Sequence, residues 1–184
     1  MSYLDNRPTV DEYAPWAAKY IDATTHALAH APRPTIHDVL SGQLTTLHAM
    51  VDAMSHADAL RPYAPGKWTL LESLLHVADT ERVFAYRILR IARGDQTPLP
   101  GFDQDTWVPF SGANDRTLAD ILTELKIVRS GTLALMRTLD DTAVARTGTT
   151  NGNTMSVRAL VWMITGHFEH QLEITRTRYL SAAD

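Results

Sequence analysis

Residues 69–93 read TLLESLLHVADTERVFAYRILRIAR and predict one long helix. Thr69 and Glu72 form a capping-box pattern, in which each side chain satisfies a free backbone N–H group at the start of a helix. Apolar residues then recur at the spacing of a helix with one buried face. They are Leu71, Leu74, Leu75, Ala78 and Leu89. Gly94 provides a natural end, because glycine readily adopts the left-handed conformation that closes a helix.

Three further segments lack internal proline and also read as helices. They cover residues 35–56, 117–141 and 156–180. Helices of this size are each about 33–38 Å long and pack well side by side. An earlier segment, residues 12–30, is partly helical in pattern but contains Pro15, and we interpret it as an arm packed across the others. The sequence therefore predicts an all-α single domain, with a four-helix bundle over residues 35–184 and an N-terminal helical arm over residues 1–34.

The connection between the second and third helices is long, from residue 94 to residue 116. It exceeds the usual length of a structureless loop, so we expect a packed loop or a lid over a site. Its length also leaves room for a crossover connection in the bundle. Residues 142–153 are rich in Thr, Gly and Asn and read as a loop with room for a short extended stretch.

Composition and charge narrow the function. The 184 residues carry a net charge of −4, which argues against nucleic-acid binding, because such proteins present a basic surface. The absence of cysteine excludes disulfides, thiolate nucleophiles and cysteine-based zinc sites. The polar N-terminus lacks the apolar core of a signal peptide, and no apolar run approaches the roughly 18 residues of a membrane span. We therefore expect a soluble, cytoplasmic protein without nucleic-acid or membrane partners.

Eight histidines are many for this length, and three stand out by position. His167 lies mid-way along the last helix and shares a face with His170 and Gln171, because residues three and four apart on a helix are neighbours. His76 lies on the second helix. Together the three imidazoles would make the three-ligand site with an open position that is typical of catalytic zinc. Spacing alone fits isolated core or surface histidines at least as well, and the HExxH pattern of metalloproteases is absent.

Four stretches of the chain carry more specific motifs. They are YAPGKWTLLE (residues 63–72), HVADTER (76–82), GFDQD (101–105) and GHFEHQ (166–171), followed by RYL (178–180). In order and spacing they resemble the DinB-like superfamily, and the resemblance extends over residues 35–180. It implies a four-helix bundle, often dimeric, that holds one divalent metal, commonly zinc or nickel. One histidine of the second helix and two of the fourth would bind the ion.

The resemblance places the first metal ligand on His76 and the second on His167. The third histidine of the family usually lies four residues after the second, where this chain has Gln171, and His170 stands beside that position. The third ligand is therefore His170, Gln171 or a water in a weaker site. We favour His170, because a neutral imidazole binds zinc or nickel better than an amide oxygen does.

The resemblance also implies metal-dependent chemistry on a small molecule. Relatives include transferases that use low-molecular-weight thiols such as bacillithiol or mycothiol, and metal-dependent hydrolases. We predict a homodimeric enzyme of one of these types, with Asp103 and Trp107 of the long loop as candidate pocket residues. The alternative is a non-catalytic metal- or ligand-binding bundle with a structural ion. Gln171 favours this alternative, because a weak third ligand weakens an active site.

Overall fold

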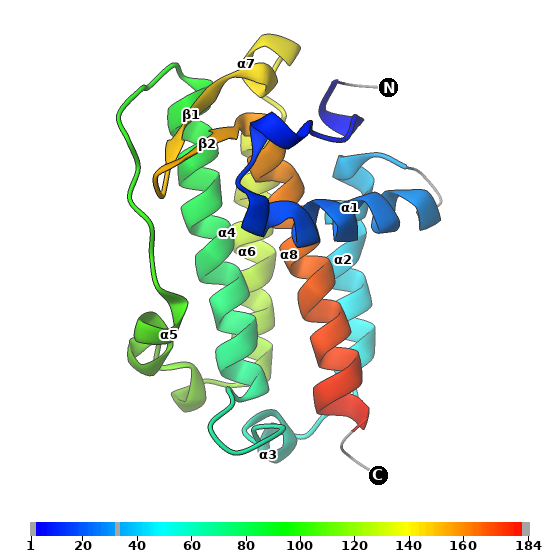
Figure 1. The fold of residues 1–184 in the computed structure, drawn as a ribbon. Helices are drawn as coiled ribbons and strands as arrows, with labels where there is room; N and C mark the ends of the chain where they lie inside the picture. The colour runs from blue at the N-terminus through cyan, green and yellow to red at the C-terminus, as the bar shows by residue number, and fades with distance from the viewer. Residues whose placement is uncertain (1–2, 32–33, 182–184) are drawn as a thin grey trace.

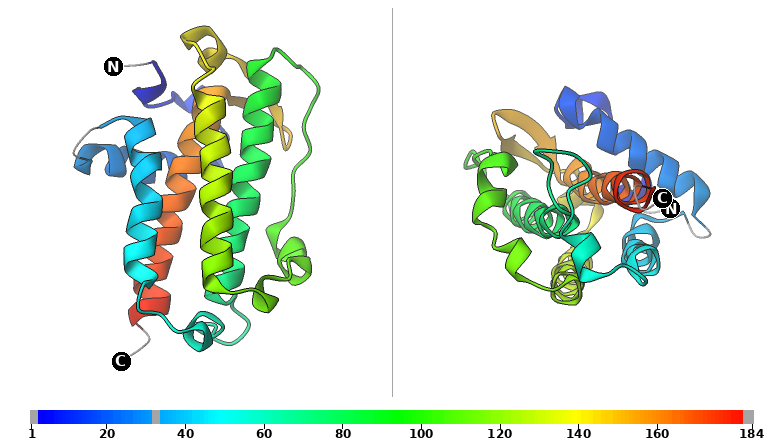
Figure 2. Two further views of the ribbon diagram at one scale, coloured as in Figure 1. Left: turned by 180° about the vertical axis from the view of Figure 1, so that it is seen from behind. Right: turned by 90° about the horizontal axis from the view of Figure 1, so that it is seen from below.

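The computed structural model describes residues 3–31 and 34–181. Four long helices stand side by side and confirm the predicted four-helix bundle (Figure 1 and Figure 2). They are α2 (Ile36–Val51), α4 (Leu70–Ala92), α6 (Leu118–Met136) and α8 (Val157–Ile174). Helices α2 and α4 each pack against both α6 and α8, so α2 and α4 lie on one diagonal of the bundle. No helix within the described ranges is long and apolar enough to cross a membrane.

Each bundle helix begins at a threonine or serine whose hydroxyl accepts a hydrogen bond from a backbone N–H group three residues later. These N-caps are Thr35, Thr69, Thr117 and Ser156. The capping box predicted at Thr69 is present, with Glu72 accepting from the Thr69 N–H group. The bundle helices therefore start where local hydrogen bonding favours a start.

The first bundle helix is shorter than the sequence predicts. Helix α2 ends at Val51, whereas the prediction extended it to His56. His56 belongs instead to a separate short helix, α3 (His56–Ala59). Ser55 begins this helix, because its hydroxyl accepts from the Asp58 N–H group at 3.1 Å and so satisfies a free donor of a new first turn.

The segment after α6 is more ordered than the predicted loop. Helix α7 (Asp141–Ala145) precedes an antiparallel hairpin of β1 (Thr147–Thr150) and β2 (Asn153–Ser156). Asn151 and Gly152 join the strands with φ angles of +49° and +73°. Two consecutive left-handed residues are what the commonest two-residue hairpin turn requires.

The long connection between α4 and α6 returns along the length of the bundle (Figure 1). It begins beside the hairpin, where the Leu99 N–H group donates to the Thr149 carbonyl and the Leu99 carbonyl accepts from the Asn151 N–H group, both at 2.9 Å. Further on it forms α5 (Gln104–Trp107). Because the chain returns before α6 begins, α4 and α6 run in the same direction, as do α2 and α8 (Figure 2).

The N-terminal arm contains α1 (Ala18–His30), which lies across α8 (Figure 1). The two backbones approach closely at Gly166, where a Cβ atom would lie only 1.9 Å from the Tyr20 carbonyl oxygen. The Thr24 hydroxyl donates to the Trp162 carbonyl at 2.7 Å beside this crossing. A glycine at position 166 is therefore what lets α1 rest on the bundle.

A carboxylate fixes the start of the arm to the start of α8. Glu12 accepts from the Ser156 hydroxyl at 2.7 Å and from Arg158 Nε at 3.1 Å. It also accepts from the Thr9 N–H group at 3.0 Å. Burial raises the pKa of Glu12, but these hydrogen bonds outweigh burial and leave the pKa at about 2. Glu12 is thus ionised at neutral pH and links the arm to the bundle.

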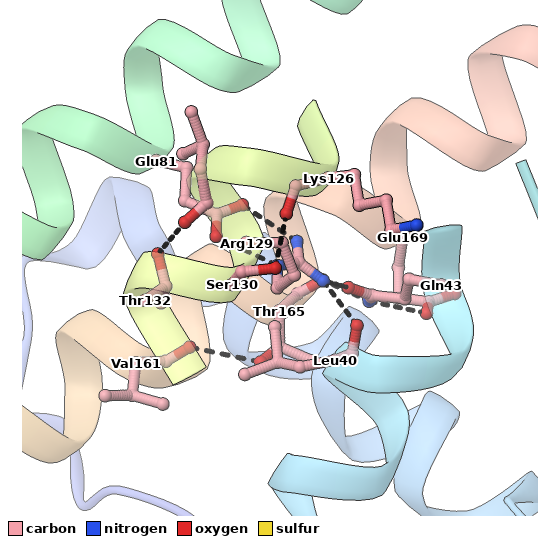
Figure 3. A network of polar contacts seen from close by, with 11 residues as sticks. Leu40, Gln43, Glu81, Lys126, Arg129, Ser130, Thr132, Val161, Thr165 and Glu169 are labelled. Atoms are coloured by element: carbon pink, nitrogen blue, oxygen red, sulfur yellow. Dashed lines mark hydrogen bonds and ion pairs between the residues drawn. The ribbon is translucent and has the colours of Figure 1, made fainter. Parts of the chain in front are cut away.

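A buried polar network connects all four bundle helices (Figure 3). Arg129 of α6 forms a two-pronged ion pair with Glu81 of α4, at 2.8 and 2.9 Å, and donates to Gln43 of α2 at 3.0 Å. Gln43 in turn donates to the Thr165 carbonyl and the Glu169 carboxylate of α8, at 2.9 and 2.8 Å. Because a buried ion pair depends on good geometry, this network favours one register of the helices.

Candidate metal centre

Two histidines from neighbouring helices face each other inside the bundle. His76 of α4 and His167 of α8 place their Nε2 atoms 3.2 Å apart, with the ring planes at 82°. Two nitrogens bound to one zinc ion at about 2.0–2.1 Å and the tetrahedral angle lie about 3.3 Å apart. The observed distance therefore fits two ligands of a single tetrahedral ion.

The environment keeps both imidazoles in the neutral form that binds metals. Burial lowers the pKa of His76 to about 4, although the negative charge of Asp105 opposes this shift. Burial also lowers the pKa of His167 to about 3, and repulsion from protonated His76 and His170 and from Lys19 adds to the effect. At neutral pH both rings have a lone pair free for a divalent cation.

Aromatic and hydroxyl groups surround the histidine pair. Trp68, next to the N-cap of α4, lies with its ring centre 5.1 Å from that of His76. Tyr20 of the arm meets His167 edge-on at 5.4 Å, and the buried Thr80 hydroxyl lies 3.4 Å from His76 Nδ1. These neighbours restrict how far either imidazole ring can turn.

The two candidates for the third ligand occupy different positions. His170 is exposed and packs edge-on against Tyr20 at 6.0 Å. Gln171 is buried, and its Oε1 atom accepts from the Ser73 hydroxyl at 3.0 Å. Within the described residues, no group of three or more His, Asp or Glu side chains is placed to share an ion. The structure thus brings two of the predicted ligands together and leaves the third apart.

The histidine pair lies in the wall of a cleft of about 590 Å³. Both candidates for the third ligand, His170 and Gln171, line the same cleft. Arm, bundle and long loop all contribute to its walls. Besides the histidines and Gln171, its principal side chains are those of Tyr20, Lys67, Trp68, Thr80, Phe84, Arg87, Phe102 and Asp105. A cleft of this size is typical of sites for small molecules.

The long loop reaches the cleft, but not through the two predicted pocket residues Asp103 and Trp107. Among the described lining residues there is neither Asp103 nor Trp107. Asp103 caps α5 by accepting from the Asp105 N–H group at 3.0 Å, and Trp107 packs on Phe102 with ring centres 4.8 Å apart. Asp103 and Trp107 thus stabilise the loop, while their neighbours Asp105 and Phe102 line the cleft.

Several side chains of the cleft were not predicted from the sequence, and Tyr20 and Arg87 are two of them. Tyr20 comes from the arm, and the chain gives no local sign that α1 lies over the histidines. Arg87 could have been found, because His76, Thr80, Phe84 and Arg87 follow each other at spacings of four, four and three residues. Such a series marks one face of a helix.

Comparison with known families agrees with the motifs. The family model of the DinB superfamily matches residues 40–175. The chain belongs to the DinB superfamily. This confirms the resemblance seen in the sequence, and the match includes both α4 and α8, which carry the histidine pair.

Solved structures show the same fold for this DinB-superfamily chain. YfiT from Bacillus subtilis, described as a probable metal-dependent hydrolase with an unusual four-helix bundle topology, matches with a TM-score of 0.69. The alignment covers 93% of this chain and 92% of YfiT at 18% sequence identity. At this identity the likeness shows the fold alone. No curated protein matches the chain in sequence.

Proposed function

We propose that this DinB-superfamily protein is a metal-dependent hydrolase of small molecules, with one divalent ion held by His76, His167 and a third ligand from the same turn of α8. The observation that carries the proposal is the 3.2 Å separation of the two Nε2 atoms in the wall of an open cleft. The description of YfiT as a probable metal-dependent hydrolase supports the same assignment. A structural ion would need no cleft beside it.

The chain's own side chains perform distinct tasks in this proposal. His76 and His167 supply neutral nitrogen ligands, and His170 is the favoured third ligand because an imidazole binds zinc or nickel better than an amide. When bound, such an ion supplies Lewis acidity, which activates water, or a thiol, as a nucleophile near neutral pH. Trp68 and Tyr20 exclude bulk water from two sides of the histidine pair.

Metal binding tests the site directly. The purified protein, stripped and reloaded with zinc or nickel, should hold one ion per chain by mass spectrometry of the eluted metal. His76→Ala and His167→Ala should each lose tight binding, whereas His48→Ala, which changes an exposed histidine of α2, should retain it. His170→Ala and Gln171→Ala then identify the third ligand. Retention of the ion by both His76→Ala and His167→Ala would refute the site.

Activity separates the reaction types. Ester and amide substrates test hydrolysis, and an electrophile supplied with bacillithiol, mycothiol, glutathione or cysteine tests thiol transfer. We expect turnover that requires the metal and disappears in His167→Ala. Turnover only with a thiol would replace the hydrolase assignment by a transferase. A fully loaded protein without either activity would favour the non-catalytic alternative.

A further inference from the structure

Arg87 is a buried arginine of α4 without an acidic partner among residues 3–31 and 34–181. Three arginines are buried in the described part of the chain, namely Arg87, Arg129 and Arg158. Arg129 and Arg158 each form an ion pair with a glutamate, whereas Arg87 takes part in no ion pair among the described residues. Its side chain makes one hydrogen bond within those residues, from Nη2 to the Pro100 carbonyl at 2.7 Å.

The N–H groups of Arg87 that have no acceptor among the described residues are evidence for a bound ligand. A guanidinium group carries five N–H donors and stays charged in proteins. Every fully buried side-chain nitrogen and oxygen in the described residues has a hydrogen-bond partner, so the unused donors of Arg87 are those that still touch the cleft. A buried charge is costly unless an opposite charge accompanies it. In this protein the opposite charge can enter through the cleft.

The surroundings of Arg87 form a built pocket. The guanidinium lies close to the rings of both Phe84 and Phe102, with its central carbon 5.5 and 5.8 Å from the ring centres. Apart from the histidines, the charged side chains that line the cleft are Lys67, Arg87 and Asp105. Asp105 is exposed and contributes to the charge seen by His76. The lining thus has one positive charge more than it has negative charges.

The position of Arg87 sets the length of the ligand. Arg87 follows His76 by eleven residues along α4, which is about 16 Å at a rise of 1.5 Å per residue. Both side chains lean towards the N-terminus of α4, and the longer arginine side chain reaches further in that direction, so the guanidinium and the imidazole are closer together than the two backbone positions. An anionic group on Arg87 would then lie on the order of 10 Å from the histidines.

We propose that Arg87 binds the carboxylate or phosphate end of an elongated small molecule whose other end reacts at the His76–His167 pair. The inference rests on the proposed function, since it assigns the substrate class of the same site. It predicts that acids with an extended chain between the anion and the reacting group fit the cleft. Short acids cannot reach both ends, and uncharged esters leave Arg87 without a partner.

A series of ω-mercapto acids, from mercaptopropionate to mercaptooctanoate, tests the proposal by calorimetry on the zinc-loaded protein. The thiol binds the ion, and the carboxylate reaches Arg87 only in the longer members. We expect mercaptooctanoate to bind about 10- to 100-fold more tightly than the uncharged mercaptooctanol. For mercaptopropionate the acid should have no such advantage over its alcohol. The phosphate monoester of mercaptooctanol carries a phosphate in place of the carboxylate. Comparing its affinity with that of mercaptooctanoate shows which anion Arg87 prefers.

Variants identify the residue that recognises the anion. Arg87→Gln should abolish the preference for the acid, and Arg87→Lys should retain part of it. Arg82→Gln, which changes an exposed arginine of the same helix, should leave the preference unchanged. If Arg87→Gln does not fold, the comparison of acid with alcohol on the unaltered protein still decides. Equal binding of mercaptooctanoate and mercaptooctanol would overturn the proposal.

Octanoate without a thiol separates the failure of this inference from the failure of the proposed function. We expect weak binding of octanoate to the metal-free protein, lost in Arg87→Gln. If octanoate binds in this way but no metal loads, the anion site stands and the metal-dependent function fails. If the metal loads and the acids bind no better than their alcohols, the function stands and the anion site fails.

Discussion

Substitution of Gly166 by alanine should lift the N-terminal arm from the bundle. The added Cβ atom would lie 1.9 Å from the Tyr20 carbonyl oxygen and 2.8 Å from the Thr24 hydroxyl. An ordinary contact begins near 3.4 Å, so α1 must retreat by about 1.5 Å. A backbone carbonyl within a helix cannot rotate away. The retreat also disturbs Ala17 and Ile21, which are fully buried between the arm and the bundle.

Two opposing effects set the magnitude. Overpacking of this kind costs about 1–3 kcal/mol, and the loss of the Thr24 hydrogen bond adds about 1 kcal/mol. Alanine within a helix regains about 1 kcal/mol relative to glycine. We expect Gly166→Ala to lower the free energy of unfolding by about 1–3 kcal/mol. Tyr20 should also move away from His167.

Urea denaturation followed by circular dichroism measures this change. Gly131→Ala in α6 is the matched control, because nothing lies within 4 Å of the added Cβ atom and only the helix propensity changes. That variant should gain up to about 1 kcal/mol. Hydrogen exchange of the α1 amides, faster in Gly166→Ala, would locate the effect. If Gly166→Ala proved as stable as Gly131→Ala, the close crossing of α1 and α8 would be wrong.

Two further predictions concern ion-paired carboxylates. Arg129→Met leaves the Glu81 carboxylate without its arginine partner and should lower the free energy of unfolding by about 3–5 kcal/mol. The double variant Arg129→Met/Glu81→Leu should recover much of this loss. Urea denaturation of both variants measures the change, and a single variant within about 1 kcal/mol of the parent would contradict the prediction. Glu12 has an ordinary pKa of 4.5 that falls to about 2 on folding, so its stabilisation is complete above pH 4.5 and is lost as the pH falls towards 2. Unfolding of Glu12→Gln should lack this part of the acid dependence, and parallel pH profiles of the two proteins would refute the link.

The bundle helices could be predicted because their signals are local. Hydroxyl caps, such as Thr69 with Glu72, and apolar residues at helical spacing act within a few turns of the chain. The hairpin also had a local sign in Asn151-Gly152, although its strands are only four residues long. The ends of α2 and α3 were harder, because Ser55 starts a new helix only after α2 has ended.

The candidate site also has a part that could be predicted from the sequence and a part that depends on tertiary packing. His76 and His167 could be proposed from the family motifs, but their 3.2 Å approach depends on how α4 and α8 pack. Asp103 and Trp107 lie in the correct loop but do not line the cleft, because Asp103 caps α5 and Trp107 packs on Phe102. The direction of a loop side chain follows from tertiary contacts that neither periodicity nor composition records.

The arm that crosses α8 supplies one wall of the cleft from a separate part of the sequence. The match to the family model begins at residue 40, whereas α1 and Tyr20 precede it. The cleft wall that contains Tyr20 and the helices that carry His76 and His167 thus come from different segments of the chain. Substitutions on α1 can reshape this wall of the cleft while α4 and α8 keep their packing, provided that position 166 stays a glycine. In this chain, the wall formed by the arm and the helices that carry the histidine pair can therefore be altered by substitutions at separate places in the sequence.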